Sequence, residues 1–142
     1  MCKIVELNTL TDAQVEEVIG LIGELDSSIK VTPEMVKRTV EAPNTHFFAV
    51  MEGEKIVGCA SLCVFESPTG RKASVEDVVV SSAYRGQHLG RRLMEYVIDY
   101  AKTFAPINLQ LTSRPERITA NKLYQSLGFQ KRETNAYRME IL

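Results

Sequence analysis

The sequence contains no tryptophan, only three cysteines and two histidines, and no long uninterrupted apolar run. Three cysteines do not make a disulfide framework, and without a Cys-x-x-Cys pair we expect no metal site. No run approaches the roughly 20 apolar residues that span a bilayer, and the first residues do not resemble a signal peptide. We therefore expect no membrane partner and a reducing, cytoplasmic location.

An excess of charge of one sign is also missing. Seventeen lysines and arginines face 18 aspartates and glutamates, so the formal net charge is −1, which disfavours a nucleic-acid-binding protein. The 44% hydrophobic and 25% charged residues are typical of a globular chain. With 142 residues, the chain is long enough for one well-packed core, so we predict a single domain over residues 1–142.

The most informative stretch, residues 75–104, reads as a strand, a tight turn and a helix. The strand is the β-branched run Val75 to Val80, and short runs of this kind favour buried strands. The helix is predicted from about His88 to Phe104. Its apolar residues recur every three or four positions, as on one face of a helix; they are Leu89, Leu93, Val97, Ala101 and Phe104.

The turn between them, Arg85-Gly86-Gln87-His88-Leu89-Gly90, can bind an anion. A helix start leaves about four N–H groups unpaired and carries a partial positive charge. Glycines let a bulky anion approach the backbone, so a phosphate or pyrophosphate is the natural ligand. The same glycines also suit a simple tight connection, and this alternative stays open. The spacing matches neither a Walker A loop nor a dinucleotide fingerprint.

The rest of the chain alternates between strands and helices in the order β-α-α-β-β-β-α-β-α-β-β. A capping-box pattern, Thr11 to Gln14, opens the first helix, and Thr32-Pro33 opens the second. Another such pattern, Ser113 to Glu116, is expected to start the last helix, which Gly128 ends. The other predicted strands are residues 3–7, 46–51, 55–66 and 107–111, with a closing hairpin of residues 129–131 and 137–141.

Two segments resemble motifs of one enzyme family. YRGQHLGRRLM, which begins at Tyr84, is similar to motif A of the GCN5-related N-acetyltransferase (GNAT) superfamily, Arg/Gln-x-x-Gly-x-Gly/Ala. Arg85 and Gly90 fill its first and last positions, whereas His88 replaces the usual middle glycine. ANKLYQSLGF, residues 120–129, resembles motif B of the same family.

The resemblance implies a fold and a cosubstrate. The fold is α/β (α+β), the GNAT fold: a mixed, mostly antiparallel twisted sheet of six to seven strands with a central parallel β-α-β pair and about four helices. The parallel strands separate, and the pantetheine of acetyl-CoA pairs with one of them while loop amides hold its pyrophosphate. By this resemblance the cofactor-binding residues are Val78, Val79, Val80, Arg85, Gly86, Gln87, His88, Leu89, Gly90, Arg91 and Asn121.

The resemblance also points to catalytic residues. Glu76 matches a catalytic glutamate of diamine acetyltransferases, acting as a base through ordered water because a carboxylate of pKa about 4 is a poor direct base for an amine. Strand alternation puts it on the face of Val78 and Val80, with Asp77 opposite. Glu76 as a substrate-attracting or structural group, and Asp77 as the base, remain alternatives. Tyr124 matches the motif B tyrosine that protonates the thiolate; its alternative is a core aromatic residue.

Together these features predict an acetyl-CoA-dependent N-acetyltransferase that acts by direct transfer in a ternary complex. The acceptor is expected to be a primary amine on a small molecule, ahead of a peptide or protein amine. Family habit favours a homodimer. The alternative is a non-catalytic acetyl-CoA-binding sensor or scaffold of the same fold, because His88 in motif A can weaken cosubstrate use.

Overall fold

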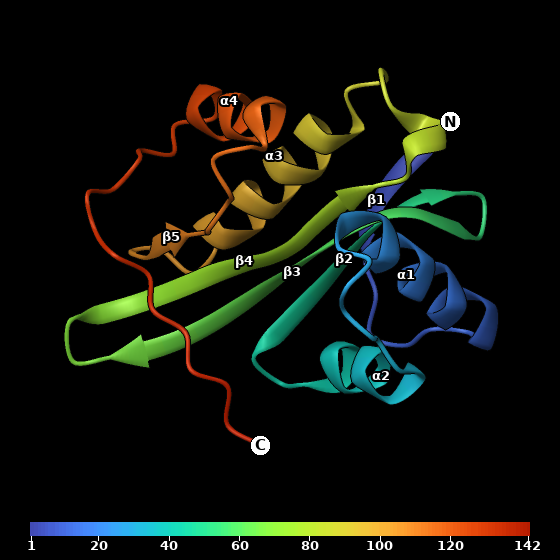
Figure 1. Cartoon of the computed structure of the whole chain (residues 1–142), viewed down its shortest axis with the longest axis horizontal. Helices are drawn as coiled ribbons and strands as arrows, with labels where there is room; N and C mark the ends of the chain where they lie inside the picture. Colours follow the sequence, from blue (N-terminus) through green and yellow to red (C-terminus); the bar gives the residue numbers. More distant parts are fainter. The chain divides into compact units, whose positions relative to one another are not determined.

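A computed structural model describes residues 1–142 (Figure 1). The chain forms two compact units, Met1–Leu111 and Thr112–Leu142. The first unit holds all five strands and three of the four α-helices. Its elements are β1 (Cys2–Glu6), α1 (Asp12–Leu25), α2 (Pro33–Glu41), β2 (Thr45–Glu52), β3 (Lys55–Ser67), β4 (Gly70–Val80), the 3₁₀ turn η1 (Ser82–Tyr84), α3 (Leu89–Lys102) and β5 (Asn108–Gln110). None of the helices is both long enough and apolar enough to cross a membrane.

The sheet of the first unit has the order β1-β2-β3-β4-β5. The first four strands pair antiparallel, and β5 pairs parallel with β4 after the chain has passed through α3. This confirms the predicted central β-α-β unit inside a mixed, mostly antiparallel sheet. Five strands form, rather than the six to seven expected.

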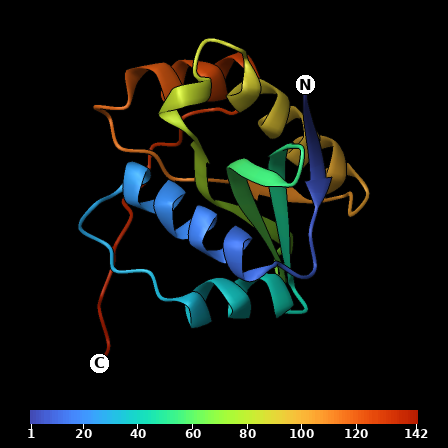
Figure 2. The same cartoon turned by 90° about the vertical axis from the view of Figure 1, so that its right-hand side faces the viewer.

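Helices cover both faces of this sheet (Figure 2). Consecutive residues of a strand point to opposite faces, and Phe47 and Phe48 of β2 show which helices lie where. Phe47 packs into a cluster with Val15 and Val18 of α1. The Phe48 ring meets the rings of Tyr96 and Tyr100 of α3 at centroid distances of 5.5 and 5.0 Å. The unit therefore has three layers, with α1 and α2 on one face and α3 on the other.

The predicted helix starts of the first unit are confirmed. Thr11 and Gln14 form a complete capping box: the Gln14 N–H donates to Thr11 Oγ1 at 3.1 Å, and the Thr11 N–H donates to Gln14 Oε1 at 3.0 Å. The Thr32 side chain caps α2, and Pro33 is its first residue. These local bonds satisfy N–H groups that a helix start leaves unpaired.

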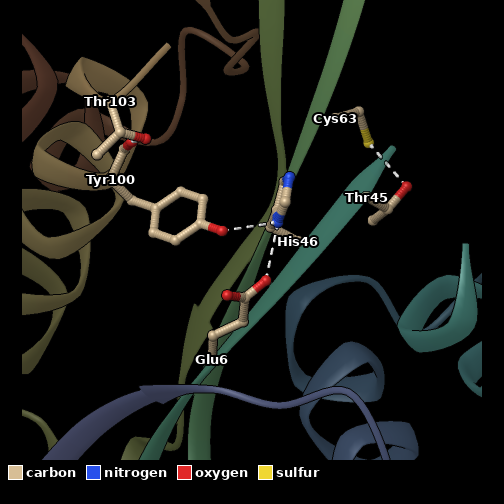
Figure 3. A network of polar contacts seen from close by, with 6 residues as sticks. All are labelled: Glu6, Thr45, His46, Cys63, Tyr100 and Thr103. Carbon is tan, nitrogen blue, oxygen red and sulfur yellow. Dashed lines mark hydrogen bonds and ion pairs between the residues drawn. The ribbon is translucent and has the colours of Figure 1, made fainter. Parts of the chain in front are cut away.

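A polar network fixes the C-terminal half of α3 to the sheet (Figure 3). His46 Nδ1 lies 2.8 Å from Glu6 Oε2 and 3.1 Å from the Tyr100 hydroxyl. The His46 ring also packs against the rings of Tyr100 and Phe104. The network joins β1, β2 and α3, so it holds the helix at the end remote from its N-terminus.

In the second unit, α4 (Ile118–Ser126) starts later than predicted. The expected cap at Ser113 was wrong: Arg117 is the N-cap residue and no side chain caps the helix. Pro115 explains the shift, because a proline disfavours helical backbone in the residue before it. The predicted end is confirmed. Gly128 has φ 104°, and the Phe129 N–H donates to the Tyr124 carbonyl at 3.1 Å, as in a Schellman motif.

The predicted closing hairpin does not form. Residues 129–131 and 137–141 have no regular structure, and every residue from 130 to 142 is exposed. No glycine or proline lies between the two runs to favour a tight turn. Without a buried face, two short strands gain too little to offset the entropy lost on ordering them.

Candidate functional site

The turn from Arg85 to His88 joins η1 to α3 and contains two residues with left-handed backbone. Gly86 has φ 82°, and His88, the N-cap residue of α3, has φ 58°. A Cβ on Gly86 would meet nothing within 4 Å, so backbone conformation rather than space requires glycine there. His88 adopts the same region as a non-glycine residue, and its side chain caps no backbone group.

Unpaired amides gather where this turn enters α3. The first backbone bond into the helix runs from the Arg92 N–H to the His88 carbonyl at 3.0 Å. The N–H groups of Leu89 and Gly90 therefore precede the hydrogen-bond ladder, at the positive end of a 14-residue helix. Arg85 and Arg91 flank them. Donors, dipole and flanking charge together form a cradle for an anion.

The outer edge of β4 is open beside this cradle. Strand β5 pairs only with Lys72–Ser74, so Val75–Val80 has no strand partner on that side. Val78 and Val80 are half-buried, whereas Val79 is buried and joins the core beneath α1. The backbone of Val78, Val79 and Val80 thus runs along an unpaired edge that leads towards the turn.

A β-bulge interrupts β4 at Asp77. Glu76 pairs with Ser61 and Val79 pairs with Cys59, so three steps along β4 match two along β3. Asp77 has φ 53°. The predicted alternation was therefore wrong here: the extra residue puts Glu76 on the same face as Val79, not with Val78 and Val80. A bulge also leaves backbone groups outside the ladder, and the sequence gives no warning of it.

Two adjacent carboxylates, Glu76 and Asp77, occupy this bulge. Glu76 accepts a hydrogen bond from the Ser74 hydroxyl. Partial burial, and then the charge of Glu76, raise the pKa of Asp77. Burial, and then the charge of Asp77, raise the pKa of Cys59 to about 12. The Cys59 thiol therefore stays protonated and cannot act as a nucleophile.

The other predicted site residues, Asn121 and Tyr124, belong to the second unit. Asn121 Nδ2 donates to the Arg114 carbonyl at 3.0 Å, which ties α4 to the preceding turn. The Tyr124 ring meets Phe129 edge-on at 6.1 Å. Burial raises the pKa of Tyr124, and the positive charge of Arg117 opposes this rise. The predicted residues thus form two sets, one in each unit.

The structure also reveals contacts around the turn that the sequence did not predict. Tyr84 and Arg92 make polar contacts with Glu52 and with the backbone of Cys2. The partners lie 32 and 90 positions apart. No local sequence signal announces contacts at such separation.

Comparisons with known proteins agree with one another. Residues 15–129 match the model of the "Acetyltransferase (GNAT) family". The N-alpha-acetyltransferase RimI of Mycobacterium tuberculosis is 28% identical over 99 residues, 70% of this chain and 61% of that protein. The glucosamine 6-phosphate N-acetyltransferase of Arabidopsis thaliana is 33% identical over 95 residues, 60% of this chain and 64% of that protein. The chain thus spans less than two thirds of the length of either relative.

Solved structures share the fold. A transcriptional regulator from Bacillus halodurans superposes with a TM-score of 0.80 and 24% identity, covering 99% of this chain and 100% of the other. An aminoglycoside acetyltransferase from an uncultured soil sample, in complex with sisomicin, gives a TM-score of 0.79 and 16% identity, with 99% and 96% covered. At these identities the likeness concerns the fold alone.

Proposed function

Because the chain belongs to the acetyltransferase (GNAT) family and has its fold, we propose that it is an acetyl-CoA-dependent N-acetyltransferase. It moves an acetyl group directly to a primary amine, on a small molecule ahead of a peptide or protein. The observation that carries the proposal is the continuous path from the open edge of β4 to the unpaired amides at the start of α3. The family match crosses both compact units, so we propose that residues 1–142 work as one domain.

In this proposal the turn binds the pyrophosphate of the cosubstrate. The amides from Gly86 to Arg91 donate to phosphate oxygens, and Arg85 and Arg91 add positive charge. The backbone of Val78, Val79 and Val80 pairs with the pantetheine amides, as an added strand pairs with a sheet edge. Acetyl-CoA supplies the acetyl thioester, which then lies at the bulge, and Asn121 contributes a further polar contact.

The bulge at Asp77 suits acetyl transfer. Backbone N–H groups that a bulge releases from the ladder can stabilise the negative charge that develops on the acetyl oxygen. The adjacent carboxylates attract a protonated amine, and Glu76 takes its proton through an ordered water. Tyr124 then gives a proton to the departing sulfur. The inert Cys59 thiol supports direct transfer rather than a cysteine-bound acetyl group.

Turnover of an amine panel tests this function. Acetyl-CoA would be incubated with the protein and glucosamine 6-phosphate, sisomicin, simple diamines and peptides with free N-termini, and free CoA thiol would be measured. The first two compounds and the peptides follow the names of the relatives and of the superposed structure. Release of CoA that depends on one amine supports the proposal, whereas binding of acetyl-CoA without turnover on any amine contradicts it.

Charge-neutralising variants separate the two carboxylates. We expect Glu76→Gln to lower kcat/KM about 100-fold, as for loss of a general base, and Asp77→Asn about 10-fold through weaker attraction of the amine. Steady-state kinetics with a cationic amine would measure both. If the order of the two effects is reversed, the base is Asp77.

Asp77→Asn should also change the pH dependence of stability. The pKa of Asp77 is raised on folding, so its contribution to stability is greatest below the unfolded pKa near 4 and is lost as pH rises through the folded value. The ionised carboxylate therefore destabilises the fold at pH 7. Asparagine tolerates the left-handed backbone, so its melting temperature should be higher by up to about 3 °C at pH 7 and unchanged at pH 3. An equal gain at both pH values would exclude charge as the cause.

His88 favours a second candidate, a non-catalytic acetyl-CoA-binding domain. His88 is the left-handed N-cap residue of α3 and belongs to the turn that forms the anion cradle, so its imidazole can crowd a phosphate bound there. In that case acetyl-CoA binds weakly and no amine is consumed.

Replacing His88 tests its effect on stability and on the affinity for CoA. His88→Gly should raise stability by about 1 kcal/mol by relieving left-handed strain, and should tighten CoA binding severalfold. His88→Ala is the matched control, because it removes the imidazole but keeps the Cβ that causes the strain. Thermal unfolding and calorimetric titration of CoA would show both effects. Unchanged CoA affinity in both variants would mean that the imidazole does not crowd the site.

A homodimer is proposed from family habit. Light scattering at micromolar concentration should give twice the chain mass of 15.9 kDa. A single species at the chain mass would refute it.

A further inference from the structure

The turn between η1 and α3 is anchored on both sides to one pair of facing residues in the sheet. Before the turn, the Tyr84 hydroxyl donates to Glu52 Oε1 at 2.7 Å. After it, Arg92 Nη2 donates to the Cys2 carbonyl at 3.1 Å. Cys2 and Glu52 are register partners in β1 and β2. Two residues eight positions apart in the sequence, one on each side of the turn, therefore attach to the same pair of facing strand residues.

A second set of contacts holds η1 itself. The Ser82 N–H donates to Glu24 Oε1 at 2.9 Å, from the last turn of α1. The Ser81 N–H donates to the Val57 carbonyl of β3 at 2.8 Å. The segment that leads into the turn is thus fastened to α1, β2 and β3.

The turn has little of its own to hold its shape. Gly86 and His88 both have left-handed backbone. Glycine has no side chain to contribute a bond, and the His88 side chain caps no backbone group of α3. Glycine adopts this conformation as one of several open to it, and a non-glycine residue such as His88 keeps it only where the surroundings determine it. The direction in which the amides point therefore depends on the anchors on either side.

From this geometry we propose that Tyr84 and Glu52 are positioning residues: their hydrogen bond sets the arrangement of the amides from Gly86 to Gly90 that receives the pyrophosphate. The inference rests on the proposed function for its ligand. The two side chains act through the turn and touch no reacting atom.

Charge and positioning predict opposite results for Glu52. As a mere negative charge near an anion site, Glu52 would weaken binding, and Glu52→Ala would tighten it. As a positioning group, Glu52 strengthens binding, and Glu52→Ala weakens it. Glu52→Gln removes the charge but keeps an oxygen for the Tyr84 hydroxyl, so it isolates the hydrogen bond.

The first experiment is calorimetric titration of CoA into the full chain. We expect Tyr84→Phe and Glu52→Ala to raise the Kd of CoA by roughly 3- to 10-fold, as for the net contribution of one ordinary hydrogen bond. Glu52→Gln should stay within about twofold of the parent. At saturating acetyl-CoA, kcat should be unchanged in all three, because no reacting group is altered.

Two matched controls each repeat one chemical change without touching the bond between Tyr84 and Glu52. Glu54 lies on the same hairpin, is exposed, and its side chain makes no hydrogen bond, so Glu54→Ala repeats the charge change alone. The Tyr96 hydroxyl has no partner, and its ring packs on Phe48, so Tyr96→Phe repeats the loss of a hydroxyl. Neither control should change the Kd. If Glu52→Ala fails to fold, Tyr84→Phe, a conservative change at a half-buried side chain, decides alone.

The second experiment needs no ligand. Amide hydrogen exchange of residues 85–91 should be faster in Tyr84→Phe and Glu52→Ala than in the parent and both controls. If the parent binds no CoA, the proposed function fails, and the exchange result still tests the anchoring. Unchanged exchange in both variants, or tighter CoA binding in Glu52→Ala, would overturn the inference.

Discussion

Replacing Tyr124 with phenylalanine is expected to lower kcat about 100-fold while the Kd for acetyl-CoA changes less than about twofold, as for loss of a general acid. Burial raises the pKa of Tyr124, so the hydroxyl keeps its proton through neutral pH. In the mechanism that we propose, it gives this proton to sulfur as the bond to the acetyl group breaks. Phenylalanine keeps the ring that packs against Phe129. Pre-steady-state kinetics and CoA titration on the same sample would separate the two quantities.

A packing role would give a different result. If Tyr124 only fills space, Tyr124→Phe should leave kcat within about twofold, and any loss should follow the melting temperature. Tyr137→Phe is the matched control, because Tyr137 belongs to the same compact unit and is 91% exposed. Parallel losses of kcat and stability in Tyr124→Phe would refute the catalytic role.

Gly86→Ala is expected to raise the Kd of acetyl-CoA about 10- to 100-fold. Gly86 has φ 82° and open space where a Cβ would go. In our proposal a phosphate occupies that space, so a methyl group there meets the ligand rather than the protein. The backbone strain adds a loss of stability of about 1–2 kcal/mol. Calorimetric titration and thermal unfolding would measure the two effects.

Gly53→Ala provides the control for strain. Gly53 has φ 60° in the β2–β3 turn, and a Cβ added there would likewise meet nothing within 4 Å. Its replacement should therefore lose similar stability and leave the Kd unchanged. If both alanine variants weaken binding equally, the effect of Gly86→Ala is strain, not contact with the ligand.

Features that depend on neighbouring residues were predictable from sequence. The capping box of Thr11 and Gln14 and the Schellman end at Gly128 each involve bonds across a few positions. The apolar stripe of α3 is equally local, and four of its five predicted residues are buried: Leu89, Leu93, Val97 and Ala101. Such patterns fix element type before any tertiary contact is known.

Features that depend on distant partners were not predictable. At the bulge of Asp77, β4 contains one residue more than the facing segment of β3. The alternation within β4 alone cannot reveal this, because it depends on the partner strand. The contact of Tyr84 with Glu52 spans 32 positions. The prediction of a C-terminal hairpin was wrong because it relied on local pattern alone. The alternation from Tyr137 to Ile141 resembles a strand, but no partner strand buries one of its faces. For the candidate site, the motif residues were predicted from sequence, whereas the contacts that hold the turn were not.

The unpaired stretch of β4 beyond Ser74 has a practical consequence for handling the protein. A bare strand edge rich in valine is a template on which other chains can add and aggregate. A ligand that lies along this edge would shield it and, by binding only the folded state, would raise the unfolding temperature with concentration. At high protein concentration, preparations kept with CoA should therefore aggregate more slowly than preparations without it.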